Sequence, residues 1–226
     1  MANPTIGRPA PRLFVLELAT FAAIFWADWA GYIPFSKTPF LFIAAWIFMA
    51  IRGVRWRSVG FSLPANWKTL LMIGVLAGVG MWLLEFFVTQ KLILRMTGHL
   101  PDLHFFDNLV GNFKLYVIYI SLSFVLAGIG EELVWRAYAL PRVASLLGGK
   151  GWAWIGALIF VNAGFGLAHL YQDLPGVIEN LIAGVLLGVL YLATGRNLIA
   201  PIAAHFVGDA TDCTLIYLGL YPGVGH

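Results

Sequence analysis

Residues 128–136, with the sequence Gly-Ile-Gly-Glu-Glu-Leu-Val-Trp-Arg, place two adjacent carboxyl groups and a guanidinium inside a long apolar run. At the centre of a bilayer each such charge costs on the order of 2.5–3.5 kcal/mol, so the cluster predicts a functional site. Residues four apart share a face of an α-helix, and Glu132 and Arg136 are therefore predicted to form an ion pair. Glu131 points in another direction and is left free for chemistry.

Two further pairs of residues have the same four-residue spacing. Phe165 and His169 end one apolar segment, and His205 and Asp209 lie in another. Phe165 is expected to wall a pocket beside His169, and Asp209 is expected to fix the tautomer and orientation of His205. Ionisable residues at helical spacing on three apolar segments therefore predict one shared polar pocket.

The composition is that of an integral membrane protein. Hydrophobic residues make up 60% of the 226 residues, charged residues make up 11%, and the mean hydropathy is +0.83. A soluble domain carries about 25% charged residues. The net charge of +3 is small and lies in loops, which argues against a nucleic-acid partner. Cys213 is the only cysteine, so there is no disulfide framework.

The apolar runs have the length of membrane-spanning helices, and none alternates like a β-strand of an outer-membrane barrel. We predict an all-α, polytopic transmembrane bundle that forms a single domain, residues 1–226. About seven spans are expected, at residues 13–33, 40–51, 69–88, 114–140, 152–170, 177–194 and 198–218. Residues 1–113 would form variable spans with an interfacial loop at 90–113, and residues 114–218 a catalytic core of four helices.

Several other residues in the spans receive structural interpretations. The glycines of the third span are expected to allow close helix approach; they are Gly74, Gly78 and Gly80. Four acidic residues are interpreted as structural because they lie near span ends or can pair locally; they are Glu17, Asp28, Glu85 and Glu179. Asp212 and Asn162 receive no assignment.

The basic residues predict the orientation of the chain. With the N-terminus in the cytoplasm, ten basic residues fall inside: Arg8, Arg12, Arg52, Arg55, Arg57, Lys68, Arg136, Arg142, Lys150 and Arg196. Only Lys37, Lys91, Arg95 and Lys114 fall outside. Because cytoplasmic loops are enriched in Lys and Arg, we predict a cytoplasmic N-terminus and an external C-terminus.

The three motifs, in this order on successive membrane helices, resemble those of the CAAX-protease and bacteriocin-processing (CPBP, or Abi) intramembrane endopeptidases. The matching residues are Glu131-Glu132-x-x-x-Arg136, Phe165-x-x-x-His169 and His205-x-x-x-Asp209, and the resemblance covers about residues 124–218. It implies peptide-bond hydrolysis by an activated water. Prenyl proteases of the eukaryotic type end the third motif with Asn, whereas this chain has Asp209. An ionised carboxylate cannot donate a hydrogen bond to an oxyanion, so His205 is the expected donor.

Two mechanisms fit these residues. In the first, which we favour and which needs no cofactor, Glu131 and His169 deprotonate water and His205 stabilises the oxyanion. In the second, His169, His205 and one glutamate, such as Glu131, bind zinc with a water in the fourth position. The chain lacks the His-Glu-x-x-His spacing that places two zinc ligands and a base on one helix.

The two histidines are expected at different depths, measured along their spans from the cytoplasmic ends. His205 lies about 10 Å from the cytoplasmic end of its span, whereas His169 lies about 26 Å along its own, at 1.5 Å per residue. We therefore predict a cytoplasm-facing intramembrane cavity and a long, tilted or raised fifth span.

The predicted function is an intramembrane endopeptidase of a bacterial cytoplasmic (inner) membrane. Its expected substrate is a membrane-associated peptide or protein, without a prediction of prenylation, and the oligomeric state is not predicted. Two alternatives stay open. One is a proton-coupled carrier that uses Glu131, His169 and Asp209 as a relay, although the chain has no internal repeat. The other is a non-catalytic scaffold or immunity protein that binds a membrane peptide.

Overall fold

The computed structural model describes residues 11–222 and residue 224, and within this part every regular element is a helix. The α-helices are α1 (Pro11–Trp29), α2 (Thr38–Ile51), α3 (Trp67–Leu84), α4 (Gln90–Thr97), α5 (Phe113–Leu122), α6 (Leu140–Leu146), α7 (Gly151–Leu167), α8 (Asp173–Ala193) and α9 (Ile199–Tyr217). Short 3₁₀ turns lie at Trp56–Val59, His104–Leu109 and Leu170–Gln172. The all-α prediction is confirmed.

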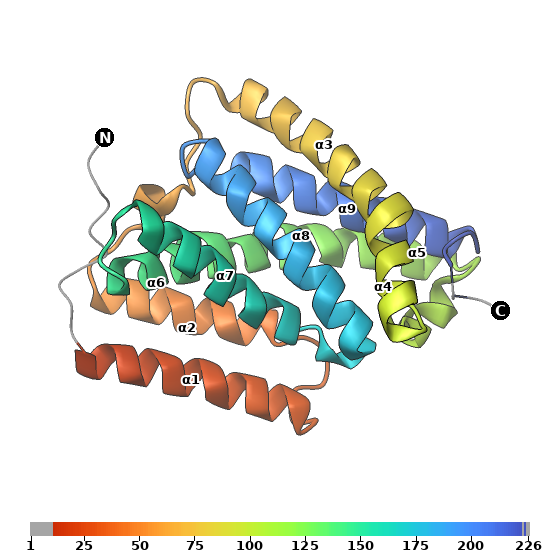
Figure 1. The fold of residues 1–226 in the computed structure, drawn as a ribbon, viewed down its shortest axis with the longest axis horizontal. Coiled ribbons are helices and arrows are strands. Elements are labelled where there is room, and N and C mark those ends of the chain that lie inside the picture. Colours follow the sequence, from red (N-terminus) through yellow and green to blue (C-terminus); the bar gives the residue numbers. More distant parts are fainter. Residues whose placement is uncertain (1–10, 223, 225–226) are drawn as a thin grey trace.

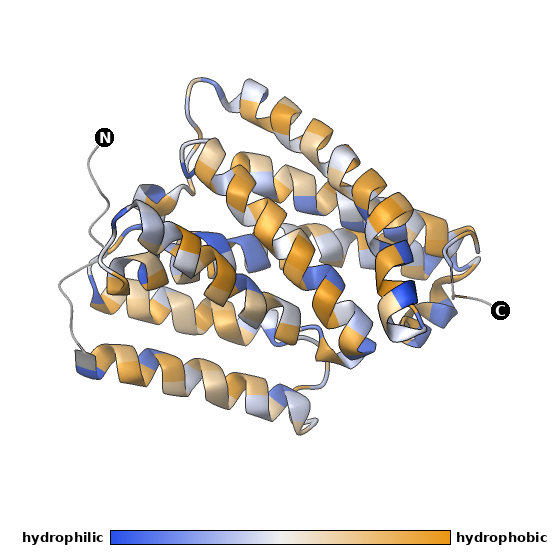
Figure 2. Cartoon of the chain, viewed as in Figure 1, coloured by the Kyte–Doolittle hydropathy of each residue, from blue (hydrophilic) through white to orange (hydrophobic). Residues whose placement is uncertain are grey.

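Three helical segments are long and apolar enough to cross a membrane: Trp67–Thr97, Phe113–Leu146 and Leu170–Ala193. Two shorter apolar helices, Thr38–Ile51 and Gly151–Leu167, accompany them. Large apolar side chains such as Leu76, Phe87 and Ile159 are exposed, which suits contact with lipid. Figure 2 shows the predominantly hydrophobic colouring of α1, α2 and α3. The chain is an integral membrane protein, and the count of seven spans stays a prediction.

The interfacial loop predicted at residues 90–113 is partly wrong. Helix α3 continues through a π-helical segment, Glu85–Thr89, into α4, which ends where Gly98 adopts a left-handed φ of 85°. A side-chain cap then starts α5, because the Asn112 carboxamide oxygen accepts a hydrogen bond from the amide of Leu115. The helix therefore extends about two turns beyond the predicted span.

The segment that carries the glutamate pair is one long helix with an unusual centre. Between α5 and α6 the chain forms two π-helical stretches, Ser123–Glu131 and Leu133–Ala139. In Figure 1 this segment runs across the whole molecule from α5 to α6. π-helical turns are rare and occur frequently at functional sites, so their presence here favours a functional site in this part of the helix.

Helices α3 and α9 pack closely through two of the three predicted glycines. A Cβ atom on Gly74 would lie 2.4 Å from the carbonyl oxygen of Ala200, and one on Gly78 would lie 2.7 Å from that of Ala204. A Cβ atom on Gly80 would have no neighbour within 4 Å, so the packing prediction is wrong for Gly80. Small residues at the first two positions therefore let α3 approach α9.

This difference predicts opposite effects of the same substitution. We expect Gly74→Ala to lower stability by about 1–3 kcal/mol, because its methyl group would clash with the backbone of α9. We expect Gly80→Ala, the matched control, to leave stability unchanged or to raise it by up to about 1 kcal/mol, because alanine is the better helix former. The measurement is thermal unfolding of both variants in the same detergent. Equal melting temperatures would contradict this account of the packing.

Ion pairs near the helix ends support the structural interpretation of two acidic residues. The carboxylate of Glu17 accepts hydrogen bonds from Arg52 Nε at 2.6 Å and Arg142 Nε at 2.9 Å, which joins α1 to the end of α2 and to α6. Asp28 pairs with Lys37 Nζ at 2.8 Å near the other end of α1. Helix α1 begins and α9 ends at opposite ends of the molecule (Figure 1).

Candidate active site

Glu132 lies between the guanidinium of Arg136 and the imidazole of His205. One carboxylate oxygen, Oε1, is 3.0 Å from Arg136 Nη1 and 2.8 Å from Nδ1 of His205. Glu132 and Arg136 are both buried, and Arg136 also donates from Nη2 to the carbonyl oxygen of Gly184 at 3.0 Å. The predicted Glu132–Arg136 pair is confirmed, and it holds the imidazole of His205 as well.

The predicted neighbours Asp209 and His205 lie close together, but no hydrogen bond joins them. The Asp209 carboxylate is 3.7 Å from Nε2 of His205, an ion-pair distance, and it accepts a hydrogen bond from Ser123 Oγ at 2.7 Å. The short contact of the His205 ring is with Glu132. The orienting role of Asp209 stays a prediction, and Glu132 is a second residue placed to orient the ring.

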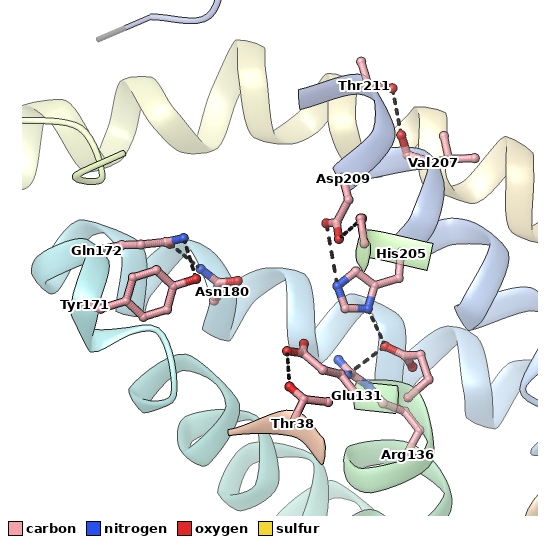
Figure 3. Close-up of polar contacts among 12 residues, drawn as sticks. Thr38, Glu131, Arg136, Tyr171, Gln172, Asn180, His205, Val207, Asp209 and Thr211 are labelled. Carbon is pink, nitrogen blue, oxygen red and sulfur yellow. Dashed lines mark hydrogen bonds and ion pairs between the residues drawn. The ribbon is translucent and has the colours of Figure 1, made fainter. Parts of the chain in front are cut away.

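Glu131 is held by one partner and has one free oxygen. Thr38 Oγ1, at the start of α2, donates to Oε1 of Glu131 at 3.2 Å, as Figure 3 shows. The second oxygen, Oε2, is buried and has no hydrogen-bond partner among the described residues. A Cβ atom on Gly130 would lie 2.9 Å from Cγ2 of Thr38, so the glycine gives Thr38 room to reach the carboxylate.

His169 lies just after the end of α7 and presents one nitrogen to the site. Its Nδ1 is 2.9 Å from the carbonyl oxygen of Phe165. A carbonyl oxygen only accepts, so Nδ1 must carry the proton and Nε2 keeps a free lone pair. The Phe165 ring lies 4.9 Å from the His169 ring and 6.2 Å from the His205 ring, measured between centroids. The ring lies near both imidazoles and lines the cavity, as predicted for the pocket wall.

These residues line one cavity of about 310 Å³. The lining includes Glu131, Phe165, His169, His205 and Asp209. Arg136 and Glu132 are not among the lining residues. Glu132 contacts the lining residue His205, and Arg136 pairs with Glu132. The predicted shared pocket is therefore present, and its members come from α7, α9 and the π-helical segment before α6.

The cavity reaches the surface at one end of the bundle. Its lining there comes from the loop before α2, the segment between α4 and α5, and the turn after α7; the residues are Phe35, Ser36, Leu103, Phe105, Phe106, Tyr171 and Gln172. The predicted topology places all three segments outside the cytoplasm. The predicted cytoplasm-facing cavity and the predicted cytoplasmic N-terminus therefore cannot both hold.

The expectation for the fifth span also changes. Helix α7 has 17 residues, so it is not the long helix that was predicted. His169 reaches the site because the cavity lies at the C-terminal end of α7, and no extension of the helix is required. Arg136, counted with the cytoplasmic loops above, is instead 1% exposed and belongs to the site.

Sequence reasoning missed three acidic residues that line the same cavity. They are Glu85, Glu179 and Asp212, of which the first two had been interpreted as structural. Asp212 follows Asp209 by three residues on α9, and this helical spacing could have indicated it. Asn162 is structural, since its side chain donates to the carbonyl oxygen of Leu158 at 2.7 Å.

The metal alternative named Glu131, His169 and His205 as ligands. The described residues contain no group of three or more His, Cys, Asp or Glu side chains placed to hold a metal ion. Nδ1 of each imidazole is engaged, by Phe165 in one case and by Glu132 in the other, so only the Nε2 atoms could bind a metal ion, as in many metal-bound imidazoles. The described side chains are not arranged as a preformed zinc site, and the metal-free and zinc mechanisms both stay predictions.

A comparison with protein-family models matches the part of the chain that contains the three motifs. A family model described as type II CAAX prenyl endopeptidase Rce1-like matches residues 113–211. This range contains the glutamate pair, both histidines and Asp209. No curated protein and no solved structure matches the chain.

Proposed function

Because residues 113–211 belong to the Rce1-like family of type II CAAX prenyl endopeptidases, we propose that this chain hydrolyses a peptide bond with a water activated by Glu131 and His169. The family makes the chain a protease that acts at the membrane. One observation supports the proposed chemistry. Glu131 and His169 both line the cavity beside His205, and the described residues give no hydrogen-bond partner to Oε2 of Glu131 or to Nε2 of His169.

In the proposed first step, Oε2 of Glu131 takes one proton from water, while Nε2 of His169 accepts a hydrogen bond from the O–H that remains and so orients the oxygen. The oxygen then bonds to the carbonyl carbon of the substrate, whose C=O π electrons move onto its oxygen. The hydrogen bond from Thr38 leaves Oε2 of Glu131 as the free oxygen for this transfer. General base catalysis of this kind contributes about 10²- to 10⁴-fold to the rate.

His205 is the proposed donor to the resulting oxyanion. Its Nδ1–H is directed to the Glu132 carboxylate, so donation to the oxyanion requires a proton on Nε2 as well. The ring acts as an imidazolium, and its positive charge lies between Glu132 at 2.8 Å and Asp209 at 3.7 Å. Asp209 accepts only, so it supplies charge and not a hydrogen bond to the substrate.

In the final step the tetrahedral intermediate collapses and the C–N bond breaks. Glu131 returns its proton to the leaving amine nitrogen, which gives one product with a new carboxyl terminus and one with a new amino terminus. Glu131 is thereby restored as a carboxylate for the next cycle.

We also propose that the cavity opens away from the cytoplasm. Basic residues at the other end of the bundle support this orientation. Arg55, Arg57 and Lys150 are exposed in or beside the loops there, and Arg196 is half-buried. Cytoplasmic loops are enriched in such residues, and the cavity end carries fewer of them. The substrate bond would then enter the site from the non-cytoplasmic face, in place of the cytoplasm-facing entry expected from the sequence.

Labelling of single cysteines tests this orientation. Cys213→Ala removes the only cysteine, and Asp107→Cys or Lys150→Cys then introduces one at an exposed position at either end. We expect a membrane-impermeant maleimide to label Asp107→Cys in intact spheroplasts and Lys150→Cys only after permeabilisation. The reverse pattern would show that the cavity faces the cytoplasm.

The protease activity itself is tested with purified protein in detergent and a mixture of internally quenched peptides. Mass spectrometry of the products identifies the cleaved bond. Activity that a chelator removes and zinc restores would overturn the metal-free mechanism.

A further inference from the structure

Part of the cavity wall is acidic and takes no part in the proposed reaction. Glu85, from the π-helical segment after α3, Glu179 from α8 and Asp212 from α9 all line it. Trp82 Nε1 donates to Oδ1 of Asp212 at 2.9 Å. Glu179 is only 9% exposed, and its Oε1 has no hydrogen-bond partner among the described residues. Glu179, which lines the cavity, thus has one carboxyl oxygen without a partner among the described residues.

These carboxyl groups differ from three others in the bundle. Glu17, Asp28 and Glu132 each pair with arginine or lysine. Among residues 11–222, no ion pair joins Glu85, Glu179 or Asp212 to a basic side chain. Ionised groups inside a membrane protein are normally paired, because an unpaired buried charge is costly. A cation that entered this part of the cavity would meet three carboxyl groups and no competing basic side chain of the described residues.

The phenol of Tyr221 lies near the same three carboxyl groups. Tyr221, which follows α9, accepts a hydrogen bond from Gln90 Nε2 at 2.7 Å and also lines the cavity. Burial raises the pKa of Tyr221 well above its ordinary value, and the negative charges of Asp212, Glu179 and Glu85 raise it further. The three carboxylates thus converge on one region near the end of α9.

We propose that Glu85, Glu179 and Asp212 form a subsite for a basic side chain, lysine or arginine, of the peptide substrate. The proposal rests on the proposed protease function. The ammonium or guanidinium group brings a positive charge to these three carboxyl groups and donates hydrogen bonds to them. A substrate without a positive charge at this position makes no such pair.

The spacing along α9 gives the register of the basic residue. Asp212 follows His205 by seven residues, which corresponds to about 10 Å along a helix. An extended peptide covers about 3.3–3.6 Å per residue, so the subsite lies about three residues from the scissile bond. Asp212 is nearer than His205 to the end of α9 at which the cavity reaches the surface.

The test uses a quenched peptide that the purified protein cleaves, with arginine or its uncharged analogue citrulline placed one to five residues from the scissile bond on either side. We expect the arginine peptide to have a kcat/KM about 10- to 100-fold higher at the position about three residues away, the range expected for a charge-assisted hydrogen bond. Glu179→Gln and Asp212→Asn are each expected to reduce this ratio to about twofold. Asp107→Asn, an exposed carboxyl outside the lining, should keep the full ratio.

Two results would overturn the subsite. The first is an equal kcat/KM for the arginine and citrulline peptides with the unmodified chain. The second is a lowered activity of both Glu179→Gln and Asp212→Asn in which the arginine-to-citrulline ratio of kcat/KM is unchanged. Binding of the same peptides, labelled with a fluorophore, to Glu131→Gln separates this proposal from the protease function. Absence of cleavage by the unmodified chain together with arginine-dependent binding would refute the protease and leave the subsite standing. Binding without discrimination between the two peptides would refute the subsite alone.

Discussion

We expect Glu131→Gln to lower kcat/KM by about 10²- to 10⁴-fold, with the loss in kcat. The glutamine side chain keeps the size and the hydrogen bond from Thr38 but has no carboxylate to take the proton of water. The variant should fold normally, because Glu131 makes no ion pair with a described residue. Cleavage of the quenched peptide, measured with the melting temperature in the same detergent, checks both statements.

Two companion variants make this result specific. His169→Ala should cause a loss of similar size, because it removes the second acceptor of the water. His104→Ala and Asp107→Asn, which alter an exposed pair outside the cavity lining, should retain activity. If Glu131→Gln and His169→Ala cleave at the unmodified rate, the proposed base is wrong. A cellular phenotype retained in both inactive variants would favour the scaffold alternative, and uptake that depends on a pH gradient would favour the carrier.

Arg136→Met is the variant for which we expect the largest loss of stability. Arg136 neutralises Glu132 in the core, donates to Gly184 and lies 4.6 Å over the ring of Phe165. Removing one partner of a buried pair leaves an uncompensated charge, which costs about 3–5 kcal/mol. For a chain of this length that corresponds to a fall in melting temperature of roughly 6–20 °C.

The matched control is Arg95→Met, which replaces an exposed arginine on α4 and should leave the melting temperature almost unchanged. The double variant Glu132→Gln with Arg136→Met should regain part of the stability, because no unpaired charge is left. It should not regain activity, because Glu132 also holds His205 at 2.8 Å. Equal melting temperatures for Arg136→Met and Arg95→Met would show that the pair contributes little.

The motif spacing was a good guide to contacts within one helix. Glu132 and Arg136 pair as predicted, and Phe165 lies against His169 because its own carbonyl oxygen binds the ring. These contacts depend on local helical geometry, which holds approximately even through the π-helical turns. The exception is His205 with Asp209, where Ser123 on another helix competes for the carboxylate.

Contacts between side chains on different helices could not be predicted from the sequence. Thr38 reaches Glu131 across 93 positions, and Ser123 reaches Asp209 across 86. Neither hydroxyl belongs to a pattern with its partner. The predictions of the cavity side and of the N-terminal side are inconsistent with each other. Depth was counted from the cytoplasmic ends of separate spans, which does not show where the packed helices leave a gap.

The sequence alone was sufficient for the all-helical membrane class, for most helix positions and for the polar residues around the glutamate pair. Apolar run length and helical periodicity carry that information locally. The tertiary structure was needed to show that Glu132 orients His205 and that Glu85, Glu179 and Asp212 share the cavity with Glu131. Each of these relations joins residues on different helices, and their proximity depends on how the helices pack.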